Sequence, residues 1–368
     1  MPKNPKAKKQ KTIKKAASPR RGLRLVAIFV LLIAIFAALG WFFYADRPIS
    51  KVRGSASLTD RQLQSLSDSQ KYQSLDLRVA ALAVYKGRPL QVDQELGVFG
   101  GVRQRIISFP VYSAGLVEKG LMTLPFGPAP AGGYPVIVLC HGYVDPRRYS
   151  TYKAYLSQMQ YYSQNGFAVV KPDFRGNGLS QNAGSPEGAY YSMAYNVDLL
   201  SLLASIKDTP YLNTNQISAW GHSMGAYIAL RAAVLSPDIK NVILLSGPVG
   251  DIKDMYTSGI APSDRSNPVA FLIRSSQLAK HGTPLSNPGF WYNVSPLNFL
   301  EKSNTHFQIH VGEQDRVVPP RFSAELDSAL TQAHKGHQYY TYFYGDHGLV
   351  PEMPTILSRS LALLQNGN

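Results

Sequence analysis

Hydrophobic and polar positions divide the chain into an amino-terminal segment and a longer region in which two patterns alternate. From about Leu75 onward, short continuous apolar runs are separated by segments of helix length. Continuous apolar runs are typical of strands buried on both faces, as in parallel sheets covered by helices. The pattern predicts strands at 105–112, 120–125, 135–140, 166–172, 216–220, 241–246, 306–311 and 338–344.

The segments between these strands include predicted helices at 151–165, 187–207, 224–235 and 320–333. A chain that alternates strand and helix forms a mainly parallel sheet with helices on both faces. The first two strands precede the first of these helices, and we expect them to pair as an antiparallel hairpin. The sequence contains no internal repeat, which excludes solenoids and propellers.

One segment, from Pro248 to about Thr305, contains six prolines and no strand pattern. Loops longer than about 15 residues are uncommon in compact domains. We therefore predict a lid insertion at about 248–305, within a domain that spans 75–368. Phe271, Phe290 and Trp291 are candidates for an apolar substrate pocket, and core packing is the alternative for these aromatic side chains.

The amino-terminal segment contains an uncharged apolar run of 20 residues, from Leu25 to Tyr44. As a helix it would rise about 30 Å, the thickness of a hydrocarbon core, and its last four residues are aromatic, as at a membrane interface. We predict a transmembrane signal anchor at 25–44 and a juxtamembrane stalk at 45–74. A cleaved signal peptide is the alternative, because 38–40 fits the cleavage rule, although the apolar run continues past that point.

The formal net charge of +15 arises from 38 Lys and Arg against 23 Asp and Glu, and ten of the basic residues lie in 1–24. A basic tail beside an apolar span is expected to stay in the cytoplasm, which places the following domain outside it. We expect no nucleic-acid partner, because the tail lacks interleaved aromatic residues. The single cysteine, Cys140, excludes disulfide scaffolds and multi-cysteine zinc sites, and we predict that it is buried.

Gly221-His222-Ser223-Met224-Gly225 joins a predicted strand to a predicted helix. In that setting G-x-S-x-G is a nucleophile elbow, in which small flanking residues permit a tight turn that presents the Ser223 hydroxyl above the sheet. A serine hydroxyl needs a base within hydrogen-bond reach and a third group that orients the base. The fold predicts the chain order serine, acid, histidine, and we assign Asp315 and His347 to the last two roles.

Other carboxylates are alternatives for the acid. Glu313 lies two residues before Asp315, and Asp251 and Asp254 follow the preceding predicted strand. Asp346 adjoins the predicted base, but its side chain would have to reach across its own backbone to orient that ring.

A tetrahedral intermediate also needs two N–H donors for its oxyanion. One is expected from the backbone of Met224, and the other from the backbone of Tyr143 in the loop after strand 135–140. The phenol of Tyr143 is a further candidate donor, or packs on substrate. We expect no metal and no organic cofactor.

The sequence resembles the α/β-hydrolase superfamily over about 100–365. Within it, the chain is similar to the catalytic domain of prolyl oligopeptidases and to dienelactone hydrolase and esterase-like proteins. The motifs that carry the resemblance are Pro135-VIVLCHGY, Asp173-FRGNGLS, Gly221-HSMG, Gly312-EQDRVVP and Gly345-DHG. The resemblance implies that Ser223, Asp315 and His347 are nucleophile, acid and base, and that Tyr143 and Met224 line the oxyanion hole.

These observations predict a membrane-anchored serine hydrolase that cleaves an ester or a peptide bond outside the cytoplasm. About 55 residues separate the predicted span from the region of resemblance, so we do not expect the propeller that gates substrates in prolyl oligopeptidases. Tyr143, Phe290 and Trp291 are the expected substrate contacts. The alternative from another class is a catalytically silent hydrolase fold that serves as a binding module.

Overall fold

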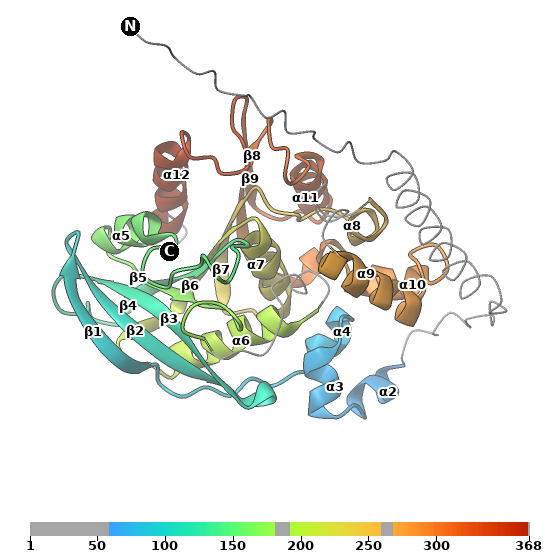
Figure 1. Ribbon diagram of the computed structural model, residues 1–368, viewed down its shortest axis with the longest axis horizontal. Coiled ribbons are helices and arrows are strands. Elements are labelled where there is room, and N and C mark those ends of the chain that lie inside the picture. Colours follow the sequence, from blue (N-terminus) through green and yellow to red (C-terminus); the bar gives the residue numbers. More distant parts are fainter. Residues whose placement is uncertain (1–58, 181–191, 259–267, 367–368) are drawn as a thin grey trace, which may run out of the picture. The chain divides into compact units, whose positions relative to one another are not determined.

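The structure is a computed structural model that describes residues 59–180, 192–258 and 268–366 (Figure 1). The described residues belong to one compact unit, Gly54–Asn368. The predicted membrane span, 25–44, lies outside them. Across the described ranges, no helix combines the length and the apolar character that crossing a membrane requires.

The described elements follow one another in an α/β order. They are α2 (Asp60–Gln64), α3 (Asp68–Gln73), α4 (Leu77–Ala80), β1 (Gln91–Phe99), β2 (Val102–Val111), η1 (Tyr112–Ala114), β3 (Leu116–Pro125), β4 (Tyr134–Cys140), α5 (Leu156–Gln164), β5 (Ala168–Pro172), α6 (Ala194–Lys207), β6 (Leu212–His222), α7 (Met224–Leu235), β7 (Ile239–Leu245), α8 (Ile252–Ser258), α9 (Pro268–His281), α10 (Pro288–Val294), η4 (Pro296–Lys302), β8 (His306–Gly312), α11 (Arg321–Gln332), β9 (His337–Tyr342) and α12 (Met353–Asn366).

One sheet of nine strands organises this region, in the order β1-β2-β3-β5-β4-β6-β7-β8-β9. Strands β4 to β9 are parallel to one another. Strands β1, β2 and β3 pair antiparallel, and β3 joins the parallel strands by pairing antiparallel with β5. The mostly parallel sheet and the antiparallel opening hairpin, β2 with β3, are as the sequence predicted. Because the parallel strands run in one direction, the loops at their carboxyl ends gather at one edge of the sheet.

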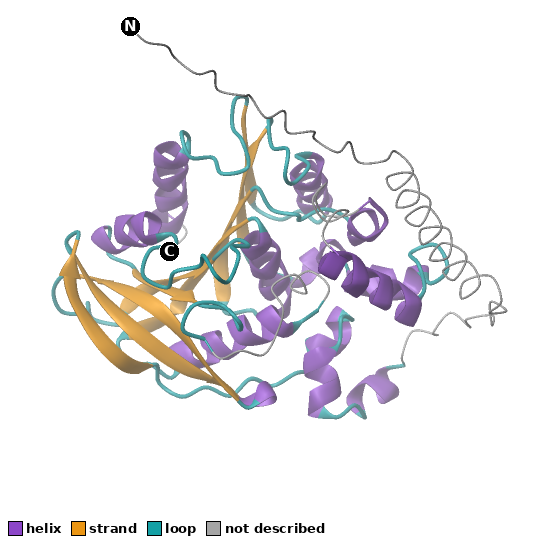
Figure 2. Ribbon diagram, in the orientation of Figure 1, coloured by secondary structure: helices purple, strands orange, loops and turns teal. Residues whose placement is uncertain are grey.

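Helices cover both faces of the sheet (Figure 2). Side chains of α5 and α12 pack against one face in a core that includes Trp220 and Ile243. Side chains of α6, α7 and α11 pack against the other face in a larger core. Strands enclosed in this way must be apolar on both sides, which explains why β4, β5 and β7 read as continuous hydrophobic runs.

The strand β1 was not predicted. Its nine residues are largely exposed, with Leu96 and Val92 partly buried against the core. An edge strand with water on most of its surface needs no apolar alternation, and polar side chains protect such an edge from pairing with other chains. The hydrophobic pattern therefore carries no signal for it.

Two short helices, α2 and α3, occupy the described part of the predicted stalk. Each begins with a capping box: Thr59 pairs reciprocally with Gln62, and Ser67 pairs with Gln70. Such pairs satisfy backbone N–H groups that a helix leaves unbonded at its first turn. The described part of the predicted lid insertion is also helical and comprises α8, α9, α10 and η4.

Candidate active site

The turn between β6 and α7 holds Ser223 in an unusual backbone conformation. Its φ is 53° and its ψ is −120°, and its backbone N–H donates to the carbonyl of Leu245 at 2.8 Å. A non-glycine residue at positive φ is strained, and such strain persists only where surrounding structure imposes it. The conformation places Ser223 at the amino terminus of α7 and at the carboxyl edge of the sheet.

The glycines of the elbow are required by close packing. A Cβ atom on Gly225 would lie 1.9 Å from the carbonyl oxygen of Cys140, and one on Gly221 would lie 2.4 Å from the carbonyl oxygen of Gly225. Both separations are far inside van der Waals contact. Helix α7 therefore approaches the sheet closely enough to form the turn only because these positions have no side chain.

The structure brings Ser223, His347 and Asp315 together. The Nε2 of His347 lies 2.9 Å from the Oγ of Ser223, and its Nδ1 lies 2.8 Å from the Oδ2 of Asp315. A carboxylate only accepts hydrogen bonds, so the proton of the neutral ring is on Nδ1 and Nε2 is the acceptor that faces the serine. The three side chains come from the loops after β6, β8 and β9.

The loops that carry the acid and the histidine are bonded to each other. The N–H of Gln314 donates to the carbonyl of Gly345 at 2.9 Å, and the N–H of Glu313 donates to the carbonyl of Tyr342 at 3.0 Å. A Cβ on Gly312 would lie 2.2 Å from that Gly345 oxygen. This contact fixes the separation of the two loops, and with it the distance between Asp315 and His347.

The alternative carboxylates lie elsewhere. Oδ1 of Asp346 accepts the N–H groups of Gly348 and Leu349 in its own turn, at 2.9 and 3.1 Å. Glu313 is exposed. Asp251 accepts the N–H of Lys253 at 2.9 Å. The carboxylate that contacts the ring of His347 is that of Asp315.

The loop after β4 lies beside the elbow, because Cys140 of β4 is aligned with Gly221 of β6. His141 is fully buried, and its Nδ1 donates to the carbonyl of Gly142 at 2.8 Å. In a planar trans peptide the C=O and the following N–H point in opposite directions, so this bond sets the direction of the Tyr143 N–H. Burial lowers the pKa of His141 to about 3, which keeps the ring neutral.

Sequence reasoning missed two further residues at this edge. His222 and Tyr155 are partly buried, and the Tyr155 hydroxyl lies 2.8 Å from Nδ1 of His222. The backbone N–H of Gly142 donates to the same hydroxyl at 3.0 Å. A histidine inside G-x-S-x-G is visible in the sequence, but Tyr155 lies 67 residues away from it, and no pattern links the two.

The predicted lid aromatics have different surroundings. Trp291 is fully buried, packs on Tyr256 and donates its ring N–H to the carbonyl of Gly282 at 3.0 Å. Phe290 is partly buried and stacks on His281, with ring centroids 4.1 Å apart. Phe271 and Tyr143 are close to half exposed. Core packing, the alternative for the aromatics, describes the position of Trp291.

Buried charges brace the loop after β5. Arg175 donates to both carboxylate oxygens of Asp198 on α6, with Nε at 3.0 Å from each. Asp173 accepts the hydroxyl of Tyr149 at 2.7 Å and the N–H of Leu179 at 3.0 Å. Nearby, burial and the charge of Asp198 raise the pKa of Glu118 to about 8. The bonds of Arg175 and Asp173 support the loop rather than the reacting atoms.

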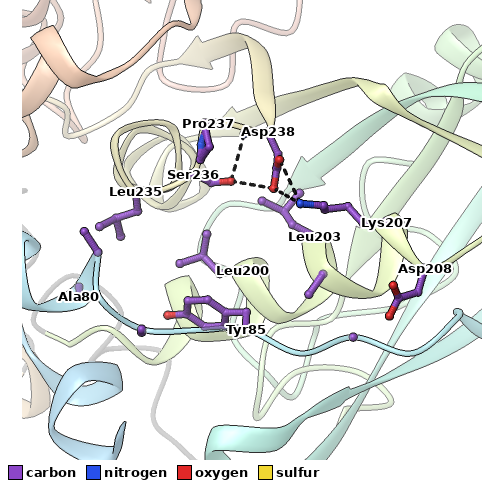
Figure 3. Close-up of a pocket in the computed structure, with 14 residues that line it drawn as sticks. Ala80, Tyr85, Leu200, Leu203, Lys207, Asp208, Leu235, Ser236, Pro237 and Asp238 are labelled. Atoms are coloured by element: carbon purple, nitrogen blue, oxygen red, sulfur yellow. Dashed lines mark hydrogen bonds and ion pairs between the residues drawn. The ribbon is translucent and has the colours of Figure 1, made fainter. Parts of the chain in front are cut away.

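A cavity of about 270 Å³ lies at the other end of α7 (Figure 3). The segment from Ala80 to Gly87, the end of α6 and residues from Leu235 to Asp238 line it. Ser223 precedes the first residue of α7, whereas Leu235 is its last. The cavity holds none of the predicted site residues, so we place the chemistry at the carboxyl edge of the sheet.

A mostly parallel sheet with helices on both faces and a strained serine in a G-x-S-x-G elbow defines a class of protein. The described region has the fold of α/β-hydrolases, which solved esterase and peptidase structures share. The family model described as serine aminopeptidase, S33, matches residues 134–279. That match includes Ser223 and ends before Asp315 and His347.

Three solved structures illustrate the shared fold. An acetyl xylan esterase from Paenibacillus sp. R4 is 16% identical with a TM-score of 0.60, covering 83% of this chain and 99% of its own. Dipeptidyl peptidase 4 from Porphyromonas gingivalis is 18% identical with a TM-score of 0.52, and the match covers 77% of this chain and 36% of that protein. An acylaminoacyl peptidase from Pyrococcus horikoshii is 19% identical with a TM-score of 0.54, and the match covers 71% of this chain and 40% of that protein.

This chain therefore spans 36% and 40% of the lengths of those two peptidases. No curated protein sequence matches the chain significantly.

Proposed function

We propose that the chain is a serine hydrolase of the peptidase or esterase type, that Ser223, His347 and Asp315 form its catalytic triad, and that it cleaves an ester or a peptide bond through an acyl-enzyme. The observation that supports the proposal most is the continuous hydrogen-bonded line from Asp315 through His347 to Ser223, with heavy-atom distances of 2.8 and 2.9 Å. Both distances lie within the range that proton transfer requires.

The proposed reaction has two halves. His347 Nε2 takes the proton of the Ser223 hydroxyl as its oxygen attacks the substrate carbonyl, and then gives that proton to the leaving alcohol or amine. Water, deprotonated by the same nitrogen, then attacks the acyl-enzyme and releases the acid. Asp315 holds the ring in the tautomer that makes Nε2 the acceptor and stabilises the imidazolium that forms.

The oxyanion is proposed to lie between the backbone N–H groups of Met224 and Tyr143. Met224 begins α7, and the first N–H groups of a helix have no acceptor within the helix. The helix dipole adds a positive potential at the same place. The Tyr143 N–H comes from the neighbouring loop, whose peptide is oriented by His141.

Fluorophosphonate labelling tests the mechanism, because these probes react with an activated serine. We expect the full-length protein to be labelled, Ser223→Ala to remain unlabelled, and the exposed Ser157→Ala on α5 to be labelled at the wild-type rate. No labelling of the wild type, or equal labelling of Ser223→Ala, would remove the triad. Either result would favour a silent hydrolase fold that binds its ligand without turnover.

The substrate is proposed to be a small ester or a short peptide. The structural neighbours support both, since their names include an esterase and two peptidases. A panel of p-nitrophenyl esters of increasing chain length, beside proline-containing peptide nitroanilides, separates the two substrates. Cleavage of the peptides alone would exclude the esterase. Loss of chain-length preference in Phe290→Ala would support its side chain as a substrate contact.

The proposed location is a membrane, with residues 25–44 as a single span, the basic tail in the cytoplasm and the hydrolase domain outside. The length and apolarity of that run and its ten basic neighbours support this topology. We expect the full-length protein to resist carbonate extraction and its domain to be digested by protease added outside intact cells. Recovery in the carbonate supernatant would contradict an uncleaved anchor.

A further inference from the structure

His222, the residue before Ser223, contacts the loops on both sides of the nucleophile. Its Nε2 lies 2.9 Å from the backbone carbonyl oxygen of His347, and its Nδ1 lies 2.8 Å from the hydroxyl of Tyr155. That hydroxyl is also 3.0 Å from the backbone nitrogen of Gly142. One imidazole thus connects the loop that carries the proposed base to the loop that carries the proposed oxyanion donor.

The chemistry of the end groups fixes every proton in this line. The carbonyl of His347 only accepts, so Nε2 of His222 carries the hydrogen. In a neutral ring Nδ1 is then an acceptor, and the Tyr155 hydroxyl donates to it. The N–H of Gly142 only donates, so it bonds to a lone pair of the same hydroxyl. Each hydrogen bond in the line therefore has one direction, and reversing any of them breaks a bond.

The neutral ring that this arrangement needs is favoured by its surroundings. The pKa of His222 is lowered to about 4, chiefly by burial and to a smaller extent by the neighbouring His347 ring, against the opposing effects of the bond to the His347 carbonyl and of Asp315 and Asp346. A charged ring would carry hydrogens on both nitrogens and would face the Tyr155 hydroxyl with a second donor.

Tyr155 is itself held in a disfavoured conformation. It precedes α5 with φ 57° and ψ 19°, the left-handed region that residues with a Cβ rarely adopt. Its ring meets that of Trp220 edge to face, with centroids 5.9 Å apart. A Cβ on Gly142 would lie 2.9 Å from its hydroxyl. Backbone strain at a residue whose only polar group points into the site suggests a functional reason for it.

The carbonyl of Gly142 is bound separately by His141, so both peptide units that flank this glycine are fixed. Tyr155 holds the unit before Gly142, and His141 holds the unit that includes the Tyr143 N–H. A shift of the first unit rotates the second about the glycine, the residue whose backbone turns most easily.

We propose that His222 and Tyr155 are positioning residues that tie the oxyanion loop to the loop of His347, so that the donor and the base are aligned together about Ser223. The inference rests on the proposed triad. It adds two residues that act through backbone groups and touch no reacting atom.

The test compares Tyr155→Phe, His222→Leu and His222→Gln in the full-length protein with a p-nitrophenyl ester. Phenylalanine keeps the ring and deletes the hydroxyl, leucine deletes both nitrogens, and glutamine keeps one donor and one acceptor. We expect Tyr155→Phe and His222→Leu to lower kcat by about 10- to 100-fold, the range for small misplacements of reacting groups, with KM within about twofold of wild type. His222→Gln is expected to recover part of that loss.

Two features separate positioning from a general loss of structure. The two substitutions break the same tie, so the double variant Tyr155→Phe/His222→Leu should lose about as much activity as the worse single variant, rather than the product of both losses. Tyr161→Phe, which deletes a hydroxyl from α5, is the matched control and should turn over at the wild-type rate. Thermal unfolding of every variant checks that each is folded.

The outcomes distinguish this inference from the proposed function. A wild-type protein that neither reacts with a fluorophosphonate nor turns over ester removes the triad itself. Wild-type activity that depends on Ser223, together with unchanged kcat in Tyr155→Phe and His222→Leu, overturns the tie alone. Multiplicative losses in the double variant also overturn it, because they show that the two residues act independently.

Discussion

The carboxylate of Asp315 divides its oxygens between His347 and its own loop. Oδ2 lies 2.8 Å from Nδ1 of His347, and Oδ1 accepts the N–H groups of Val317 and Val318 at 2.8 and 2.9 Å. The two backbone donors leave the carboxylate one orientation, in which the second oxygen faces the ring.

This division predicts the result of Asp315→Asn. The backbone donors at 317 and 318 keep the amide oxygen on their side, so the amide NH₂ faces His347. Nδ1 must then accept, the ring proton moves to Nε2, and the ring can no longer take the serine proton. We expect kcat to fall by about 10⁴-fold with the fold intact. Glu313→Gln, in the same loop and exposed, serves as the control, and an equal loss there would contradict the assignment of the acid.

Gly225→Ala is expected to destabilise the domain. Its Cβ would lie 1.9 Å from the backbone carbonyl of Cys140, and backbone atoms of a central strand have no free direction in which to move. We expect the free energy of unfolding in urea to fall by at least about 3 kcal/mol. Gly289→Ala on α10, where a Cβ meets nothing within 4 Å, should be neutral or slightly stabilising. Equal effects would show that the elbow is not tightly packed.

Glu118→Gln tests the buried carboxyl on β3. The pKa of Glu118 is raised from 4.5 to about 8 by burial and by Asp198. Between these values the folded chain binds a proton that the unfolded chain does not, so the free energy of unfolding falls as pH rises. Glutamine has no proton to lose. We therefore expect Glu118→Gln to be more stable than wild type by a few kcal/mol at pH 8, and to lose this advantage at the acid end of the range.

Urea unfolding at several pH values measures that difference, with Glu301→Gln, an exposed carboxyl, as the control. A Glu118→Gln variant that is less stable than wild type at pH 8 would mean that the carboxylate is ionised and stabilising in the folded chain.

Buried histidines have the opposite pH dependence. Burial lowers the pKa of His310 from 6.5 to about 3, with a smaller effect of the Arg359 charge. In this window the unfolded chain binds a proton that the folded chain does not, so the free energy of unfolding falls as pH drops from about 6.5. We expect His310→Gln to reduce the slope by about 1.4 kcal/mol per pH unit. The exposed His334→Gln should leave it unchanged, and an unaltered slope in His310→Gln would show that its ring is charged in the folded state.

Local sequence was sufficient for the elements whose chemistry lies within a few residues. Strands β4, β5 and β7 are buried on both faces, and such strands need apolar side chains at successive positions. Their sequences therefore contain continuous apolar runs that can be recognised without the structure. The elbow could be predicted because a strand, two glycines, a serine and a helix are consecutive. The order of Ser223, Asp315 and His347 follows from the same fold, since each comes just after a parallel strand.

Other features depend on residues that only the tertiary structure brings together. Strand β1 is an exposed edge, so burial leaves no periodic pattern in it. Trp291 reads equally well as a substrate contact or as core, and its packing against Tyr256 is a relationship between distant segments. Tyr155 and His222 meet through parallel strands that align their carboxyl ends. The sequence by itself determined the fold class and the candidate nucleophile, acid and base, whereas the tertiary structure decided what holds them in place, because hydrogen bonds between loops depend on distances that local pattern does not encode.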